Sequence, residues 1–112
     1  MNILFLCTSN LHRSKTAADY FSKLNNHHQF KGAGLDFRNC KQHGTTFCTD
    51  EMLAWADEIF VMESVHVQKV MMYSCSSNKK IINLNIQDIY IFNDAKLIEV
   101  LQNHNDLRLL QA

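Results

Sequence analysis

The sequence of 112 residues contains no proline and only three glycines, so the residues that most often mark turns are scarce. Asn, Ser and Asp must mark the ends of its elements instead. Net charge is also lacking, because 11 basic residues balance 11 acidic ones. This neutrality argues against nucleic acid or an anionic membrane as the main partner, since both bind basic surfaces.

Long apolar runs are absent too, and no stretch approaches the length that spans a bilayer. The first residues carry no basic segment ahead of their short apolar run, so we expect no signal peptide. We therefore predict a cytoplasmic protein. With 46% apolar and 20% charged residues, the composition predicts one globular domain over residues 1–112.

Cysteine and histidine occur without the spacing of a metal site. The four cysteines, Cys7, Cys40, Cys48 and Cys75, include no Cys-x-x-Cys pair, and the six histidines are scattered. We predict no metal and no cofactor. A core of this size needs no disulfides, so we expect free thiols. For Cys40, Cys48 and Cys75 we expect packing or surface roles.

Short apolar runs alternate with segments of helical periodicity. The runs at 2–7, 29–34, 59–62 and 81–84 are strand candidates. Helices are predicted from Ser14 to about Asn25, after Thr49 and Ser64 as N-caps, and after Asp94, another N-cap, through Leu97, Ile98 and Leu101 toward Leu107 and Leu110. The alternation predicts a three-layer α/β/α domain built on a parallel sheet. Such folds bind ligands at the carboxyl ends of their strands.

The loop after the first predicted strand carries a possible phosphate site, with the sequence Cys7-Thr8-Ser9-Asn10-Leu11-His12-Arg13-Ser14. Backbone N–H groups of residues 8–14 can surround one tetrahedral oxyanion, and the following helix adds its positive N-terminus. Arg13 can bind two phosphate oxygens with its planar fork. The positive field would favour the thiolate of Cys7, which makes it a nucleophile beneath the anion. The structural alternative is a buried cysteine at a strand end and a solvated arginine.

This loop resembles that of the low-molecular-weight protein tyrosine phosphatases, particularly their short bacterial branch. The resemblance runs nearly end to end. It includes Gly32-Ala33-Gly34 after the second strand, residues 55–63 with His66 at the third strand, and the segments Ile86-Gln87-Asp88-Ile89-Tyr90 and Asn93-Asp94-Ala95-Lys96-Leu97-Ile98. The family likeness implies a four-stranded sheet in the order 2-1-3-4.

The resemblance also implies a role for each site residue. Cys7 would form a phosphocysteine, Arg13 and the amides of residues 8–14 would bind the phosphate, and Ser14 would donate a hydrogen bond to the thiolate. Asn10 would brace the loop in a left-handed conformation. Asp88 would be the general acid and base, and Tyr90 would line the substrate cleft. The implied partners are a phosphotyrosine protein or a small aryl phosphate, with phosphate, sulfate and vanadate as ligands.

Four positions depart from the family pattern. Ser9 stands where Gly is common, His12 where a second Cys is common, Lys15 replaces Pro, and Ile89 replaces the Pro after the acid. His12 either adds positive charge near the anion or points outward, and we favour the outward orientation. Asp94 is a rival for the acid, although its place suits a helix cap better.

Three other activities stay open. An arsenate reductase shares this fold and loop, and a weakly active or silent oxyanion-binding domain with a regulatory role would also fit. The phosphocysteine-carrying components of sugar transport have a similar loop but lack the arginine, so Arg13 argues against them.

Overall fold

The computed structural model describes residues 1–24, 27–73 and 78–111. Its centre is a parallel sheet of four strands in the order β2-β1-β3-β4, as expected. The strands and helices are, in chain order, β1 (Asn2–Cys7), α1 (Arg13–Leu24), β2 (Gln29–Gly34), α2 (Phe37–His43), α3 (Asp50–Trp55), β3 (Glu58–Val61), α4 (Ser64–Met71), β4 (Lys80–Asn83), α5 (Ala95–Asn103) and the 3-10 helix η2 (Asn105–Gln111).

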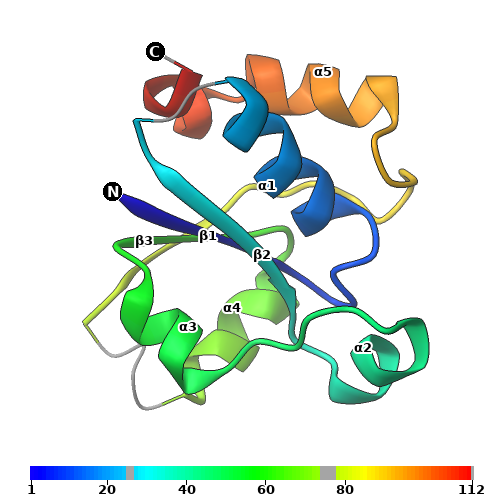
Figure 1. Cartoon of the computed structure of the whole chain (residues 1–112), viewed down its shortest axis with the longest axis vertical. Coiled ribbons are helices and arrows are strands. Elements are labelled where there is room, and N and C mark those ends of the chain that lie inside the picture. The colour runs from blue at the N-terminus through cyan, green and yellow to red at the C-terminus, as the bar shows by residue number, and fades with distance from the viewer. Residues whose placement is uncertain (25–26, 74–77, 112) are drawn as a thin grey trace.

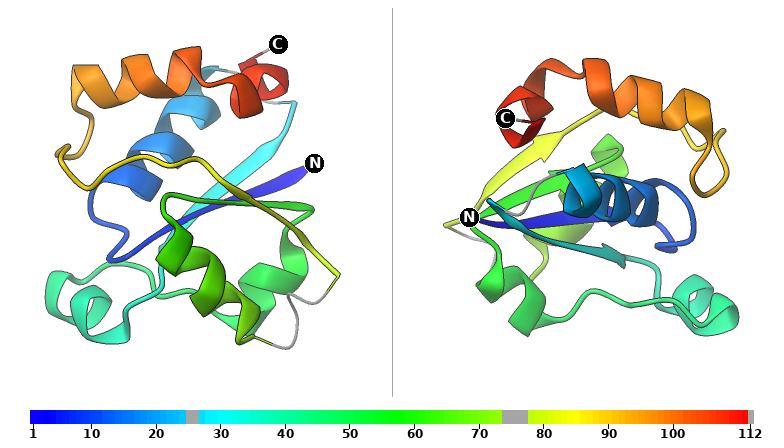
Figure 2. Two further views of the ribbon diagram at one scale, coloured as in Figure 1. Left: turned by 180° about the vertical axis from the view of Figure 1, so that it is seen from behind. Right: turned by 45° about the horizontal axis from the view of Figure 1, so that its top comes forward.

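Helices cover both faces of the sheet, which makes the predicted three layers. Helices α1 and α5 and the helix η2 lie on one face, and α3 and α4 lie on the other (Figures 1 and 2). Alternate residues of β1 point into the two cores: Phe5 packs with α1 and α5, whereas Leu4 and Leu6 pack with α3 and α4. Because β1 is buried on both faces, nearly all its residues are apolar, which explains the continuous apolar run from which the strand was predicted.

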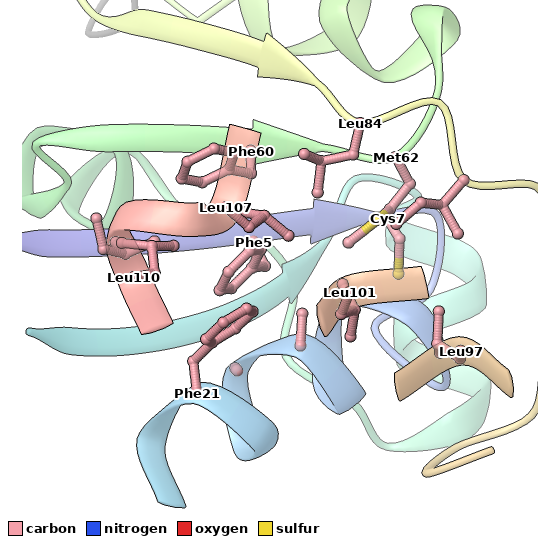
Figure 3. Close-up of a cluster of buried hydrophobic side chains, with 14 residues drawn as sticks. Phe5, Cys7, Phe21, Phe60, Met62, Leu84, Leu97, Leu101, Leu107 and Leu110 are labelled. Carbon is pink, nitrogen blue, oxygen red and sulfur yellow. The ribbon is translucent and has the colours of Figure 1, made fainter. Parts of the chain in front are cut away.

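The core on the α1 side reaches the end of β1. Figure 3 shows Cys7 beside Met62, Leu84, Leu97 and Leu101, and only 3% of Cys7 is exposed. The candidate nucleophile therefore belongs to the packed interior, at the carboxyl edge of the sheet.

The predicted caps hold in two of three cases. Thr49 accepts a hydrogen bond from Met52 N, and Asp94 accepts one from Lys96 N at 2.9 Å. Ser64 was wrong as an N-cap: the cap is Glu63, and Ser64 is the first helical residue of α4. Strand β3 ends at Val61, and Glu63, after the buried Met62, still has extended backbone angles, so the helix begins only once the chain has left the sheet edge.

Helix α2 was not among the expected elements. Asp36 caps its start by accepting a hydrogen bond from Asn39 N at 3.0 Å, and Gly44 ends it with a left-handed φ of 65°. Cys40 is its one buried residue, so the segment has no apolar period that would announce a helix. It lies beyond the carboxyl end of β2 (Figure 1).

No helix in the described part of the chain is long and apolar enough to cross a membrane.

Candidate phosphate-binding site

Residues 8–12 turn at the end of β1 and lead directly into α1, whose first residues are Arg13 and Ser14. Within this first loop, defined as residues 8–14, Asn10 has a φ of 52°, the left-handed conformation expected for it. Its side-chain oxygen accepts a hydrogen bond from Ser14 Oγ at 2.7 Å. The loop is therefore closed on itself across one turn.

The Ser14 hydroxyl lies 3.0 Å from the sulfur of Cys7, which is the contact that the resemblance implies. It also lies 2.7 Å from Asn10 Oδ1 and 3.2 Å from the Ala33 carbonyl. One hydroxyl hydrogen can serve only one of these acceptors at a time. The geometry lets a Cys7 thiol donate to Ser14, and lets Ser14 turn its hydrogen toward a Cys7 thiolate.

Arg13 is 2% exposed and paired with carboxylates. Its Nη1 donates to Glu63 Oε2 and to the Ile86 carbonyl, both at 2.7 Å, and its Nε lies 3.7 Å from Asp88 Oδ1. A guanidinium carries five N–H donors, so these contacts can leave both Nη2 hydrogens for an anion. The arginine is thus desolvated and held in place between the segments that follow β3 and β4.

Asp88 lies over the first loop, as expected for a residue after the fourth strand. It belongs to the acid loop, defined as residues 85–93, and its side chain is 62% exposed. The rival Asp94 instead caps α5. Tyr90 is half-buried and packs against the core that contains Cys7. The expected catalytic residues Cys7, Arg13 and Asp88 therefore come together at one edge of the sheet.

His66 fastens the first loop to the start of α4 and is 1% exposed. Its Nδ1 accepts a hydrogen bond from Glu63 N at 3.1 Å, so its Nε2 carries the proton and donates to Thr8 Oγ1 at 3.0 Å. Burial, together with the nearby charge of Arg13, lowers the pKa of His66 to about 4, so the imidazole is neutral at physiological pH.

Glu63 and His66 belong to the segment that resembles the family, but the sequence indicates no role for either. Both act on distant residues: Glu63 on Arg13, 50 positions away, and His66 on Thr8, 58 positions away. The available signal was their position directly after a buried strand that neighbours β1.

His12 is half-buried, and its side chain contacts the acid loop. Its Nδ1 accepts a hydrogen bond from Phe92 N in the acid loop at 3.0 Å. The acceptor nitrogen carries no proton, and the ring is directed at the neighbouring loop. The Phe92 amide thus takes the place of a water molecule as hydrogen-bond donor to His12.

Two glycines of β2 allow the first loop to pack closely on that strand. A Cβ on Gly32 would lie 2.9 Å from both Asn10 Oδ1 and the Ser14 carbonyl. One on Gly34 would lie 2.8 Å from the Thr8 carbonyl and 2.5 Å from Cys40 Sγ. Thr45, just after α2, adds a hydrogen bond to the Ser9 carbonyl.

Cys40 and Cys48 are buried free thiols, consistent with the packing role expected for them. Burial raises the pKa of both, that of Cys48 to about 12, so both stay protonated at neutral pH. Cys75 lies outside the described residues. Within the ranges that the structure describes, no group of three or more His, Cys, Asp or Glu side chains could hold a metal ion.

The sequence matches no protein-family model and no curated protein. Solved structures do resemble the chain over nearly its full length, and they share its three-layer α/β/α fold. YwlE arginine phosphatase from Geobacillus stearothermophilus is 21% identical, with 98% of this chain and 87% of that chain covered and a TM-score of 0.63.

Two tyrosine phosphatases resemble it equally well. Wzb from Escherichia coli K30, in complex with sulphate, is 20% identical, with 98% and 90% of the two chains covered and a TM-score of 0.65. AmsI from Erwinia amylovora is 21% identical, with 98% and 85% covered and a TM-score of 0.67. This chain therefore has the fold of the bacterial low-molecular-weight protein tyrosine phosphatases.

Proposed function

We propose that this protein is a cysteine-dependent phosphomonoester hydrolase whose substrate is phosphotyrosine in proteins. One observation carries the proposal: the thiol of Cys7 beside Ser14, the buried guanidinium of Arg13 and the carboxylate of Asp88 converge at one edge of the sheet. These are a nucleophile, a phosphate-binding cation and a proton donor. The fold shared with known phosphatases supports the same conclusion.

The first half-reaction transfers the phosphoryl group to the protein. The Cys7 thiolate attacks phosphorus in line, the bond between phosphorus and the tyrosine oxygen breaks, and Asp88 donates its proton to that oxygen. Arg13 and the amides of residues 8–14 stabilise the charge on the three equatorial oxygens. The products are tyrosine and a phosphocysteine on Cys7.

The second half-reaction regenerates the enzyme. Asp88, now ionised, takes a proton from water as the water oxygen attacks phosphorus, and the bond between phosphorus and sulfur breaks. Inorganic phosphate leaves, and the Ser14 hydroxyl donates a hydrogen bond to the departing thiolate. Neither half-reaction needs a cofactor, because Arg13 and the loop amides supply the positive field.

The side chains after Asp88 favour an aryl leaving group. Ile89 and Ile91 are 69% and 67% exposed, and Tyr90 lies between them. An apolar edge stabilises a phenyl ring better than a guanidinium, which would lose hydration there. This supports phosphotyrosine over phosphoarginine, the alternative that the name of the Geobacillus neighbour raises.

Inorganic oxyanions should bind the same site. Solved neighbours hold sulphate, phosphate and benzylphosphonate. For this chain we propose phosphate, sulfate and vanadate as ligands of residues 8–14. Because Cys7 must remain a free thiol to react, we also propose a reducing compartment, the cytoplasm.

Turnover of para-nitrophenyl phosphate, phosphotyrosine peptide and phosphoarginine by the wild type and Cys7→Ser tests the proposal. We expect hydrolysis that a chelator does not inhibit and that Cys7→Ser lowers by at least about 10⁴-fold. Full activity of Cys7→Ser would contradict the mechanism. Arsenate reduction with thioredoxin would identify a reductase instead, and tight vanadate binding without turnover would identify a silent binding domain.

A further inference from the structure

Three contacts join the start of α1 to the far end of the acid loop. His12 Nδ1 accepts a hydrogen bond from Phe92 N at 3.0 Å, and Thr16 Oγ1 accepts one from Asn93 N at 2.8 Å. The ammonium group of Lys15 lies 4.9 Å from the centre of the Phe92 ring. In the left view of Figure 2 the two segments pass each other at the same corner of the molecule.

The acid loop depends on such contacts because its own sequence does little to restrict it. The chain has no proline, so Ile89 rather than a ring of fixed φ follows Asp88. Asp88, Ile89 and Ile91 are each more than 60% exposed and contribute little burial to hold the loop. At its near end the loop is anchored through Ile86, whose amide donates to the Met62 carbonyl at 2.8 Å. The far end is anchored at Phe92 and Asn93.

We propose that His12 is a positioning residue for the general acid. It fastens the acid loop to the helix that carries Arg13, which keeps the Asp88 carboxylate over the first loop. This inference rests on the proposed function, because it assigns Asp88 a proton-transfer step. His12 acts through the backbone of Phe92, four residues beyond Asp88, and not by contact with the substrate.

Among the three contacts, that of His12 lies next to the residue that pairs with the acid. His12 precedes Arg13 directly, and the guanidinium of Arg13 lies 3.7 Å from Asp88. The acid loop thus meets adjacent residues of the first loop at two points, Asp88 on Arg13 and Phe92 on His12. Loss of the second point leaves the far end of the loop on the Thr16–Asn93 hydrogen bond and the Lys15–Phe92 contact alone. Asp88 itself is then held by an ion pair whose carboxylate is 62% exposed and therefore weakly attracted.

Two matched variants separate the hydrogen bond from the bulk of the side chain. His12→Asn keeps an acceptor near the position of Nδ1, whereas His12→Leu fills similar space without one. We expect His12→Leu to lower kcat for phosphotyrosine about 10-fold to 100-fold, the range that misplacement of a catalytic group produces. The loss on para-nitrophenyl phosphate should be smaller, since its leaving group needs less protonation. His12→Asn should recover most of the activity.

The double variant tests whether His12 acts through Asp88. In an Asp88→Asn background, we expect His12→Leu to cause no further loss that depends on the leaving group. Both His12 variants keep the backbone amide that residue 12 contributes to the first loop, so vanadate inhibition should weaken less than phosphotyrosine turnover. The inference would be overturned if the loss caused by His12→Leu added fully to that of Asp88→Asn. It would also be overturned if His12→Leu slowed phosphotyrosine and para-nitrophenyl phosphate equally.

Hydrogen exchange at the Phe92 amide gives a readout independent of catalysis. Exchange should accelerate in His12→Leu and stay slow in His12→Asn and wild type. If the wild type hydrolyses phosphotyrosine but Phe92 exchanges equally in all three proteins, the positioning role is wrong and the proposed function stands. If Phe92 responds but no hydrolysis depends on Cys7, the proposed function fails while the contact itself is supported.

Discussion

The two loops that meet at Arg13 are held in different ways. In the first loop Asn10, Arg13 and Ser14 are all less than 8% exposed, and partners from β2, α4 and the segment after α2 hold it. In the acid loop Asp88 is 62% exposed and lies on a segment anchored near its ends.

This difference matches the work that each loop would do. An anion-binding group is most effective when it is desolvated and fixed before the substrate arrives, because no reorganisation is then needed. A proton donor must approach the leaving oxygen and then water, so a loop that is anchored near its ends lets Asp88 itself adjust. If the first loop is rigid and the acid loop adjustable, substitutions in the two should differ in size and in their dependence on the substrate.

Removing Arg13 should have a larger effect than removing Asp88, because it takes the cation out of the rigid loop. Arg13→Ala leaves Glu63 and Asp88 without their partner and deletes the phosphate-binding fork. We expect kcat/KM to fall about 10³-fold and vanadate inhibition to weaken greatly. Steady-state kinetics measure both. Arg13→Lys keeps the charge without the fork and should recover only part. Unchanged vanadate affinity in a folded Arg13→Ala protein would contradict the assignment.

Removing the acid should have a smaller effect, and one that depends on the substrate. Asp88→Asn should slow phosphotyrosine hydrolysis roughly 10²–10³-fold, the usual contribution of one placed acid, and para-nitrophenyl phosphate hydrolysis much less. Asp94→Asn is the matched control: Asn also caps helices, so both its stability and its kinetics should stay near wild type. If Asp94→Asn carries the loss that depends on the leaving group, Asp88 is not the acid.

A methyl group at Gly34, in β2, should disturb the rigid first loop where the loop packs on that strand. The added Cβ meets the Thr8 carbonyl and Cys40 Sγ at distances that force a shift. We expect Gly34→Ala to lower the free energy of unfolding by about 2–3 kcal/mol and to reduce vanadate affinity. Gly44→Ala provides the control, since nothing lies within 4 Å of its Cβ and only the positive φ is strained. It should cost about 1 kcal/mol in urea unfolding and leave vanadate affinity unchanged.

The neutral state of His66 should make the rigid loop sensitive to acid. Its folded-state pKa of about 4 lies below the ordinary value of 6.5, so the unfolded chain binds more protons between these values. The stability that His66 contributes is complete above about pH 6.5 and is lost as the pH falls toward 4.

Urea unfolding at pH 7.5 and pH 5.0 measures this effect. We expect His66 to account for a loss of about 2 kcal/mol between the two pH values, from about 1.4 kcal/mol per unit of pKa. His66→Gln has no titrating ring, so between these pH values its free energy of unfolding should fall by about 2 kcal/mol less than that of the wild type. An equal loss in both proteins would show that His66 is not held neutral.

Local sequence was enough to predict most of the fold. The apolar run of β1, the helical period of α1 and the caps Thr49 and Asp94 depend on residues within a few positions of each other. The spacing from Cys7 to Ser14 likewise belongs to one turn between a strand and a helix. The short helix α2 escaped prediction because only Cys40 of its residues is buried, which leaves no period to detect.

The order of residues along the chain already encodes the alternation of strands and helices and the cysteine–arginine loop after the first strand. Three contacts instead arise from folding: Glu63 holds Arg13, His66 binds Thr8 and His12 binds Phe92. These contacts join segments 50 to 80 positions apart. These contacts form because neighbouring strands bring their loops to the same edge of the sheet. No local pattern of residues encodes which strands are neighbours.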